Sequence, residues 1–539
     1  MLATTATTTL FGLEAHLVRV EVECCPGPSG FELVGLAEAS VRESRVRIRS
    51  ALAQLGVGLD EYRLVVNLAP GDLRKGGSGF DLAIALAALA ALGRVPAEAL
   101  AGFLLLGELS LAGDVRPVPG LLPQLLFARR LGFASALVPA ANGAEAAAVA
   151  GVRAWLAPTL GAVVDHFERG VHLHRARPSG APAAEAPEGE DLADVRGQAA
   201  ARRALEIAAA GHHHLLMVGP PGGGKTMLAR RLAGVLPPLS EDEALEVSAV
   251  HSVAGLLSPE RGLLARRPFR SPHHTASDAG LVGGGYPPRP GELSLAHQGV
   301  LFLDELAEFR RSALEALRQP LEDGEITIAR ARSRARFPAR PLVVAASNPC
   351  PCGYHGDGRG RCACSPEAVR RYLGRLSGPL VDRFDLHVAL PPVDVGSLAS
   401  PGSGEASAAV RARVEEARAR QLARAKAGGL RAALNASLSP VELAAVATPD
   451  AEGRRLLLAA VDRLGLSARA YGKALKVART IADLAGAERV GAAHLAEAIG
   501  LRPFDRAPSR ARPAPAPAAE ASPETVRSLN GAARGEPAA

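Results

Sequence analysis

Hydrophobic and polar positions follow different periods in different stretches of this chain, and the changes of period mark its parts. In residues 1–170, strand-like runs such as 63–68 alternate with alanine- and leucine-rich helical stretches such as 80–92. Short apolar runs bounded by turn or polar residues recur farther along, at 215–218, 300–303 and 341–347. Such runs are typical of buried strands in a parallel sheet, so we expect an α/β fold.

The last third of the chain has a helical period instead. In residues 405–502, alanine, leucine and arginine recur at helical spacing, which predicts a helical domain. Residues 171–190 are rich in proline, glycine and glutamate, the composition of a linker. Residues 503–539 form a proline- and alanine-rich tail that we expect to be disordered. The predicted domains are therefore 1–170, 191–395 and 405–502.

Composition agrees with several domains built on small side chains. The length of 539 residues corresponds to about three domains. Hydrophobic residues make up 48% but aromatic residues only 4%, so alanine, leucine and valine must form the cores. The net charge of +7 permits a nucleic-acid partner without requiring one. We expect a cytoplasmic protein without a membrane segment, because no apolar run reaches roughly 18 residues, the N-terminus does not resemble a signal peptide, and six cysteines do not make a disulfide scaffold.

The apolar run 215–218 leads into the sequence GPPGGGKT and then into a helical stretch at 227–236. This is the G-x-x-x-x-G-K-[ST] pattern in a strand–loop–helix setting, which favours a phosphate-binding loop over a glycine-rich turn. Glycines let backbone N–H groups face phosphate oxygens, Lys225 can reach the β- and γ-phosphates, and Thr226 can ligate Mg²⁺. The predicted nucleotide contacts are Gly219, Pro220, Pro221, Gly222, Gly223, Gly224, Lys225 and Thr226.

Two further strand ends carry polar residues that suit nucleotide hydrolysis. The run 300–303 ends in Asp304 and Glu305, and the run 341–347 ends in Asn348. At the carboxyl edge of a parallel sheet, Asp304 would hold Mg²⁺ and Glu305 would activate the attacking water. Asn348 would contact that water or the γ-phosphate. Taken alone, these residues could equally be a solvated acidic turn and a polar turn before a proline.

An arginine-rich segment, IARARSRARF at 328–337, has arginine at every second position, namely Arg330, Arg332, Arg334 and Arg336. On an extended strand or hairpin this period brings side chains to one face, where four positive charges repel unless an anion lies there. We interpret the segment as a sequence-independent contact to the phosphate backbone of DNA. That the partner is DNA, bound inside the pore of a ring, is implied by the family resemblance given below. The alternative is a solvated basic edge that prevents unwanted strand pairing.

Four of the six cysteines, Cys350, Cys352, Cys362 and Cys364, form the pattern C-x-C-x₉-C-x-C. Four thiolates in one loop can form a tetrahedral Zn²⁺ site, with His355 inside the loop as a substitute ligand. The spacing differs from the usual C-x₂-C, so reduced structural cysteines and a redox-sensitive pair remain alternatives.

Together these motifs resemble an AAA+ ATPase. The residues that carry the resemblance are DLADVRGQ at 191–198, the phosphate loop, Asp304, Glu305, Asn348 and DRFD at 382–385. Four more motifs make the chain similar to the Mg-chelatase-like YifB/ComM family over residues 1–502: RPFRSPHHT at 267–275, PGELSLAH at 290–297, NPCPCG at 348–353 and SARAY at 467–471. The chemistry of the paired histidines in the first motif does not follow from the sequence; a contact to DNA or to another subunit is one interpretation.

The resemblance implies an enzyme that needs ATP and Mg²⁺ and assembles into a ring, expected to be a hexamer. It implies that Val195, in the segment 191–198, contacts the nucleotide. Arg383 is implied as an arginine finger offered to the γ-phosphate on a neighbouring subunit, with Arg375 as a nearby competitor. Arg469 is implied as a second sensor that reaches from the helical lid to the nucleotide.

The N-terminal domain resembles the domain of Lon-type proteases, a ribosomal S5 domain 2-like fold, through DLRKGGSGFDL at 72–82 and GELSLAGDVRP at 107–117. Proteolytic members need a serine and a lysine base. Either Ser78 or Gly79 falls at the nucleophile position, and the downstream lysine position reads GLLPQ at 120–124, without a lysine. We therefore expect a domain without the catalytic dyad, as in the RadA-type recombination ATPases, with Lys75 as the remaining local base.

The resemblance thus implies a Lon-protease-like domain, an AAA+ parallel-sheet phosphate-loop domain and a C-terminal helical lid. It implies single-stranded or branched DNA as the partner, and the activity of a branch-migration helicase that promotes homologous recombination in natural transformation. One alternative is the motor subunit of a magnesium or cobalt chelatase, and another is a chaperone of the inactive-protease type. Chelatase motor subunits usually lack the Lon-like domain, so that domain favours the helicase.

Overall fold

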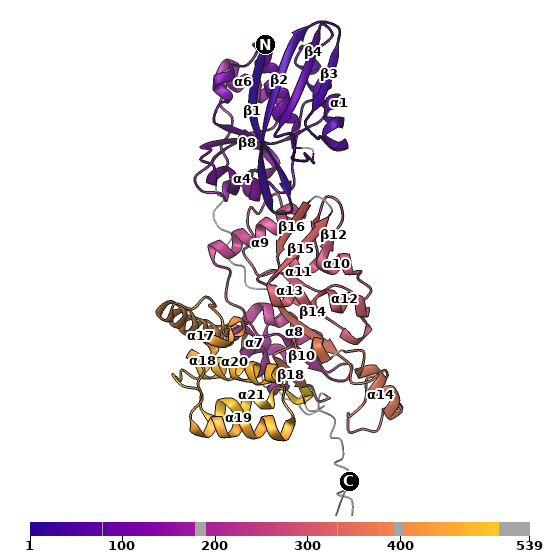
Figure 1. Ribbon diagram of the computed structural model, residues 1–539, viewed down its shortest axis with the longest axis vertical. Coiled ribbons are helices and arrows are strands. Elements are labelled where there is room, and N and C mark those ends of the chain that lie inside the picture. The colour runs from indigo at the N-terminus through magenta and orange to yellow at the C-terminus, as the bar shows by residue number, and fades with distance from the viewer. Residues whose placement is uncertain (78, 178–189, 331–332, 377, 393–403, 506–539) are drawn as a thin grey trace, which may run out of the picture.

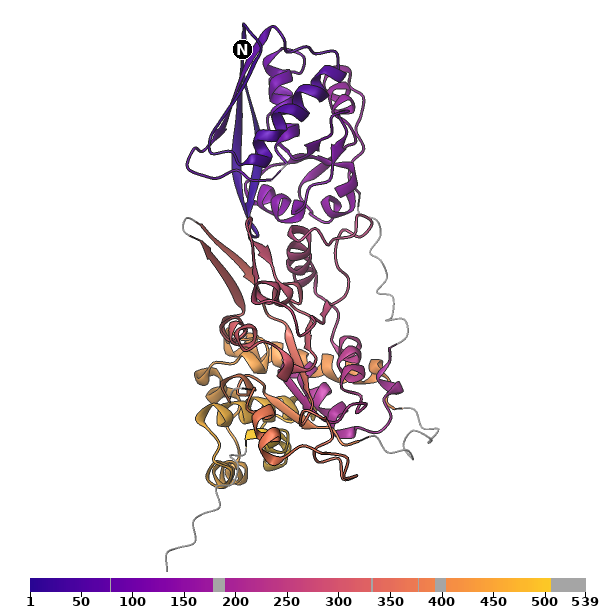
Figure 2. The ribbon, with the colours of Figure 1, turned by 90° about the vertical axis from the view of Figure 1, so that its right-hand side faces the viewer.

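The computed structural model describes residues 1–505 except 78, 178–189, 331–332, 377 and 393–403. They form three parts that follow one another along the long axis of the molecule (Figures 1 and 2). The N-terminal part lies at one end, the part with the phosphate loop lies in the middle, and a helical part lies at the other end. No helix in the described part of the chain is long and apolar enough to cross a membrane.

The N-terminal part is a mixed seven-stranded sheet with helices. Strands β1 (Leu2–Phe11) and β2 (Glu14–Pro26) form a long antiparallel hairpin. Helix α2 (Asp81–Ala91) packs on both strands and is buried at every residue except Ala90, which explains its almost wholly apolar sequence. The sheet order is β3 (Gly30–Val34), β4 (Tyr62–Ala69), β2, β1, β5 (Phe103–Leu105), β8 (Ser135–Pro139) and β9 (Arg153–Ala157). The other elements are α1 (Ala39–Gln54), α3 (Ala97–Leu100), α4 (Leu121–Arg130), α5 (Gly143–Ala147), α6 (Leu160–Arg169) and the small pair β6 (Glu108–Leu109) and β7 (Val115–Arg116).

The middle part is built on a five-stranded parallel sheet, which confirms the predicted α/β fold. The three apolar runs form β10 (Leu215–Val218), β14 (Val300–Leu303) and β17 (Leu342–Ser347), all fully buried. The order is β11 (Phe269–Arg270), β14, β17, β10 and β18 (Leu386–Ala389), so three strand ends with predicted site residues are neighbours. The surrounding elements are α7 (Ala199–Gly211), α8 (Lys225–Val235), α9 (Glu241–Val253), α10 (Asp278–Val282), α11 (Glu292–Leu295), α12 (Arg311–Ala316), α13 (Arg318–Asp323), α14 (Pro366–Leu373), α15 (Gly378–Val381), and the hairpins β12 (Gly283–Gly284) with β13 (Arg289–Pro290) and β15 (Glu325–Arg330) with β16 (Ser333–Pro338).

The C-terminal part is a helical lid, as expected. Its helices are α17 (Ser407–Gly428), α18 (Pro440–Val446), α19 (Ala451–Leu464), α20 (Ala468–Leu484) and α21 (Ala492–Gly500). Helices α17 and α20 pack against α7, and α17 also packs against α8, so lid and sheet share one hydrophobic core. This packing determines where the start of α20, and with it Arg469, lies.

The N-terminal and middle parts meet where α9 packs against α4. The backbone N–H of Gly120 donates to the carbonyl of Ser252 at 3.0 Å. The Ser252 hydroxyl donates to the buried carboxylate of Glu145, which also accepts from the Leu122 N–H at 2.8 Å. Burial raises the pKa of Glu145. Because a buried polar group without partners is costly, these hydrogen bonds favour one fixed docking of the two parts.

Candidate active site

The phosphate loop follows β10 and ends where α8 begins at Lys225. Gly222 and Gly224 have φ of +75° and +85°, a left-handed backbone that side chains with a Cβ rarely adopt. The Lys225 ammonium is mostly buried and donates to the carbonyls of Gly219 at 2.7 Å and Pro220 at 3.0 Å. The loop is thus shaped in advance, and the helix N-terminus behind it attracts anions.

Adjacent strand ends bring the predicted hydrolytic residues to this loop. Lys225 Nζ donates to Asn348 Oδ1 at 3.1 Å, and Thr226 Oγ1 donates to Asp304 Oδ2 at 2.9 Å. Asp304 Oδ1 accepts the backbone N–H of Glu305 at 2.9 Å. Burial lowers the pKa of Lys225, while Asp304 and Glu305 oppose that shift. The site therefore joins the cation of the loop after β10 with two carboxylates at the end of β14 and one amide at the end of β17.

The segment 191–198 is tied to the loop and to α8 behind it. Gln198 Nε2 donates to the Gly223 carbonyl at 3.3 Å, and Arg231 on α8 donates to the Asp191 carbonyl at 2.7 Å. Val195 is fully buried within this segment. The sequence motif located the segment, but only the structure identifies Gln198 as a contact to the phosphate loop.

The residues present fit a magnesium nucleotide. A hydroxyl and a carboxylate, Thr226 and Asp304, stand side by side as the hard oxygen ligands that Mg²⁺ takes. A side chain on Gly219 would come within 2.8 Å of Leu390 Cβ, so the close packing of the loop requires glycine there.

Arg383 lies at the opposite edge of the sheet from the phosphate loop. The Asp385 N–H donates to the His214 carbonyl at 2.9 Å, at the amino end of β10. The strand then runs from Leu215 to Gly219, about 13 Å at roughly 3.3 Å per residue. Arg383 itself pairs with Glu322 at 2.5 Å.

Arg469, at the start of α20, lines the same cavity as Arg383, with a volume of about 1580 Å³. Among the described residues, this cavity is lined by none of the phosphate loop. Arg375, the competitor for the finger role, instead pairs with Glu308 at 3.1 Å, three residues after Glu305. Arg383 and Arg469 therefore line a cavity that this chain's own phosphate loop does not border, whereas Arg375 pairs with a residue close in sequence to Glu305.

The four cysteines of the loop after Asn348 come together. Sγ of Cys350 lies 3.4 Å from that of Cys352 and 3.8 Å from that of Cys362, and Cys352 and Cys362 are 3.7 Å apart. With Cys364, all four Sγ atoms lie within 4.8 Å of one another. A tetrahedron with Zn–S bonds of about 2.3 Å has edges of about 3.8 Å, so the spacing fits zinc. His355 contributes its backbone N–H to Cys350 Sγ at 3.3 Å.

This cysteine cluster lies against the phosphate loop. Gly353, between its two halves, has φ of +84°, and a Cβ there would come within 2.7 Å of the Pro221 ring. The backbone N–H of Tyr354 contributes most to lowering the pKa of Cys352 to about 6. Backbone hydrogen bonds lower the pKa values of Cys362 and Cys364, but burial and the neighbouring sulfurs outweigh them, so both pKa values are raised. The sulfur spacing, rather than the acidity of one thiol, is therefore what fits a metal site.

The arginine segment is a hairpin, and this corrects the predicted arrangement. Arg334 and Arg336 on β16 are exposed and stand opposite Ala329 and Thr327. Arg330 pairs with Ser333, the position next to the pair of Arg334, and neighbouring pairs lie on opposite faces of a hairpin. Arg332 lies outside the described residues. The prediction that all four arginines share one face is therefore wrong. Because the chain turns back between Arg330 and Ser333, Arg330 lies on the opposite face of the hairpin from Arg334 and Arg336.

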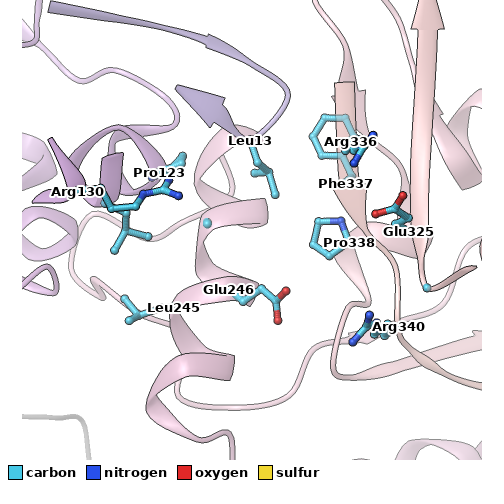
Figure 3. Close-up of a pocket in the computed structure, with 13 residues that line it drawn as sticks. Leu13, Pro123, Arg130, Leu245, Glu246, Glu325, Arg336, Phe337, Pro338 and Arg340 are labelled. Carbon is cyan, nitrogen blue, oxygen red and sulfur yellow. The ribbon is translucent and has the colours of Figure 1, made fainter. Parts of the chain in front are cut away.

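Arg336 also borders a cavity of about 530 Å³ between the hairpin and the N-terminal part. Figure 3 shows Leu13 and Arg130 on one side of it, Phe337 and Pro338 on the other. The charged lining consists of Arg130, Arg336, Arg340, Glu246 and Glu325. The cavity thus brings an arginine of the N-terminal part close to the arginine hairpin.

The predicted loss of the protease dyad concerns residues of the N-terminal part. Ser78 lies outside the described residues. Gln124, the last residue of the segment 120–124 at the expected lysine position, is buried. It accepts a hydrogen bond from Thr8 Oγ1 at 2.7 Å and donates one to the Gly120 carbonyl at 2.9 Å. Lys75 is fully buried, donates to the Pro70 carbonyl, and has its pKa lowered by burial. The local lysine thus already has a backbone partner.

Comparison with known proteins assigns a chain of this architecture to a family. Three family models, described as magnesium chelatase subunit ChlI, subunit ChlI of Mg-chelatase and the C-terminal part of subunit ChlI, match residues 191–398, 20–142 and 404–502. Competence protein ComM of Haemophilus influenzae is 44% identical, covering 92% of this chain and 96% of its own. The chain belongs to the Mg-chelatase-like YifB/ComM family of AAA+ proteins. Its YifB relative in Escherichia coli is 43% identical, over 92% of this chain and 96% of that protein, and a Mycobacterium tuberculosis relative is 46% identical over 91% and 96%.

The N-terminal part of this YifB/ComM family member is also similar to proteases. Lon protease 3 of Sorangium cellulosum is 32% identical over 132 residues, which cover 23% of this chain and 16% of the protease. This supports the Lon-like architecture. The model that matches residues 20–142 is itself described as a chelatase subunit, so the N-terminal domain alone does not separate helicase from chelatase.

Proposed function

We propose that this protein is an ATP-hydrolysing ring motor, expected to be a hexamer, that acts on single-stranded or branched DNA. The observation that carries the proposal is the division of the site between two edges of one sheet. Lys225 and Thr226 hold Asn348 and Asp304 at one edge, while Arg383 and Arg469 share a cavity at the other. Such a division suits a head-to-tail ring, in which each subunit completes the site of the next.

In this mechanism each residue has one task. Thr226 and Asp304 would hold Mg²⁺, which when bound neutralises phosphate charge, and Lys225 would contact the β- and γ-phosphates. Glu305 would take up the proton of the attacking water, and Asn348 would orient that water or the γ-phosphate. Arg383, from the neighbouring subunit, would neutralise charge that develops in the transition state. The loop glycines and Val195 would position the nucleotide.

DNA would be held by the hairpin arginines through its phosphates. Arg334 and Arg336 are exposed and adjacent in one row of β16, and Arg130 lies across the cavity from Arg336. Contacts of this kind are independent of base sequence and weaken with salt. The name of the Haemophilus relative, a competence protein, supports natural transformation as the setting. Within that setting we propose branch migration that promotes homologous recombination.

We also propose that Cys350, Cys352, Cys362 and Cys364 hold a structural Zn²⁺. The sulfur spacing and the absence of a disulfide among the described cysteines support this. The ion would stiffen the loop that carries Gly353 against Pro221, and so hold Asn348 at the phosphate loop.

The experiment is the ATPase rate with and without single-stranded and forked DNA, together with a strand-migration assay on a gel. Arg334→Ala with Arg336→Ala is expected to weaken DNA binding and to flatten its dependence on salt. The matched control is Arg42→Ala with Arg45→Ala, which removes the same charge from exposed positions on α1. Binding by the hairpin variant that matches this control across a salt series would exclude the hairpin as the DNA contact.

The second candidate is a chelatase motor subunit, favoured by the descriptions of the three matching family models. It predicts ATP hydrolysis that no DNA stimulates and no strand migration. The same experiment therefore separates the two functions.

A further inference from the structure

Asp385 joins the segment that carries Arg383 to the lid helix that carries Arg469. It lies two residues after Arg383, directly before β18, and its side chain is 9% exposed. Asp385 Oδ1 pairs with the Lys473 ammonium at 2.8 Å. Lys473 follows Arg469 by four residues on α20, so these two side chains share one face of the helix. One ion pair therefore connects the two arginines that border the same cavity.

A second connection between Asp385 and α20 runs through His213. This histidine lies between α7 and β10 and is fully buried. Its Nδ1 lies 3.3 Å from Asp385 Oδ2, and its Nε2 lies 2.8 Å from Oγ1 of Thr480 on α20. Burial alone would raise the pKa of Asp385, but Lys473 and His213 outweigh burial and hold that pKa well below its ordinary value. Asp385 is therefore an ionised group that is tied to α20 at two points.

The backbone at Asp385 is held as well. Its N–H donates to the His214 carbonyl at 2.9 Å, and its own carbonyl accepts from Arg502 at 2.7 Å. A buried ion pair adds little net stability, because taking two charges out of water costs about as much as their attraction returns. A network in which each polar group has its partners does fix geometry, because few other arrangements satisfy it. The connection is thus better suited to setting positions than to stabilising the lid.

We propose that Asp385 and Lys473 are positioning residues that set the spacing between Arg383 and Arg469, so that both arginines reach the nucleotide of the neighbouring subunit together. The inference rests on the shared site proposed above. A displacement of about 1 Å can cost about 10²-fold in rate, so a link of fixed length between the arginines acts on kcat. The phosphate loop of the other subunit binds the nucleotide, so KM for ATP is set elsewhere.

The test is steady-state ATP hydrolysis by full-length variants. Asp385→Ala with Lys473→Met removes both charges together, which avoids an unpaired buried charge, and should lower kcat about 10- to 100-fold with KM for ATP unchanged. Asp385→Glu keeps the ion pair but lengthens it by one methylene group. It should lower kcat about tenfold, even if the double variant folds poorly. The matched control is Asp462→Ala with Lys426→Met, which removes the same two charges from exposed positions on α19 and α17.

Mixing variants separates a positioning role from a structural one. Both Asp385 variants keep their own phosphate loop, so an equal mixture with Lys225→Ala completes about a quarter of the sites and should reach about a quarter of the parent rate. An equal mixture with Arg383→Ala completes no site and should fall to about half the rate of the Asp385 variant alone. A variant whose fold or assembly is damaged would be complemented by neither partner.

A kcat equal to that of the parent in either Asp385 variant overturns the inference, as does a raised KM with kcat unchanged. The reference is the mixture of Arg383→Ala with Lys225→Ala. If the reference recovers activity but Lys225→Ala does not complement the Asp385 variants, the inference fails while the shared site of the proposed function stands. If the reference does not recover activity, the shared site fails and the inference fails with it.

Discussion

Mixing two inactive variants tests whether the active site is shared between subunits. Lys225→Ala removes the cation that the phosphate loop holds between its own carbonyls and Asn348. Arg383→Ala leaves the loop intact and removes the arginine at the opposite edge of the sheet, about 13 Å away along β10. Loss of an arginine finger reduces kcat by about 10³ to 10⁵, so each variant alone should be almost inactive.

The expected rate of the mixture follows from the geometry. If each site takes its phosphate loop from one subunit and its Arg383 from the next, a random equal mixture has an intact loop in half of the sites and an intact finger facing half of those. About a quarter of the sites are then complete, whatever the ring size, so the mixture should recover about a quarter of the parent rate. That is more than about 100-fold above either variant alone.

The assay is steady-state ATP hydrolysis after the two proteins are mixed and allowed to exchange subunits, with exchange followed by mixed-label native electrophoresis. The control mixes Lys225→Ala with the double variant Lys225→Ala, Arg383→Ala, which can form no complete site. Mixed rings that hydrolyse ATP no faster than the separate variants would refute the argument from the two edges of the sheet. Arg375, paired with Glu308 near the loop, would then become the stronger candidate.

Three further predictions concern the metal, the lid and pH. Cys352→Ser with Cys362→Ser should lower bound zinc, measured by elemental analysis, from about one per chain to near zero. In the parent, the buried Arg479 pairs with Asp483 at 2.9 Å, and Asp483→Ala removes that carboxylate. Chemical denaturation should show that the free energy of unfolding falls by about 3–5 kcal/mol. Burial lowers the pKa of His214 to about 4. As the pH falls below about 6.5, the unfolded chain therefore binds a proton at this histidine before the folded chain does, and the free energy of unfolding should fall by about 2 kcal/mol between neutral pH and pH 5. Chemical denaturation at neutral pH and at pH 5 should show a smaller loss for His214→Asn.

Much of the nucleotide site was predictable because its signals are local. The loop motif lies between a buried strand and a helix in consecutive residues, so its conformation depends on its own glycines. Asp304 and Asn348 each end an apolar run, and parallel strands deliver their ends to one edge of the sheet. The cysteines were predictable for the same reason, since one short loop holds all four.

The sequence was less informative where a contact joins distant segments. The hairpin illustrates this, because the period of two in the arginines says nothing about where the chain turns back, and the turn moves Arg330 to another row. The paired histidines are a second example. Their motif was visible, but the contact of His274 with Glu305 depends on β11 pairing beside β14.

The sequence by itself determined the family, the α/β fold, the phosphate loop and the residues gathered at the carboxyl edge, because hydrophobic period and turn chemistry act over a few neighbouring residues. Only the tertiary structure decided that the lid packs against α7 and α8, that Arg383 and Arg469 share a cavity that the phosphate loop does not line, and that His274 contacts Glu305. These arrangements arise from burying apolar faces that lie far apart along the chain, and that packing has no signature in local sequence.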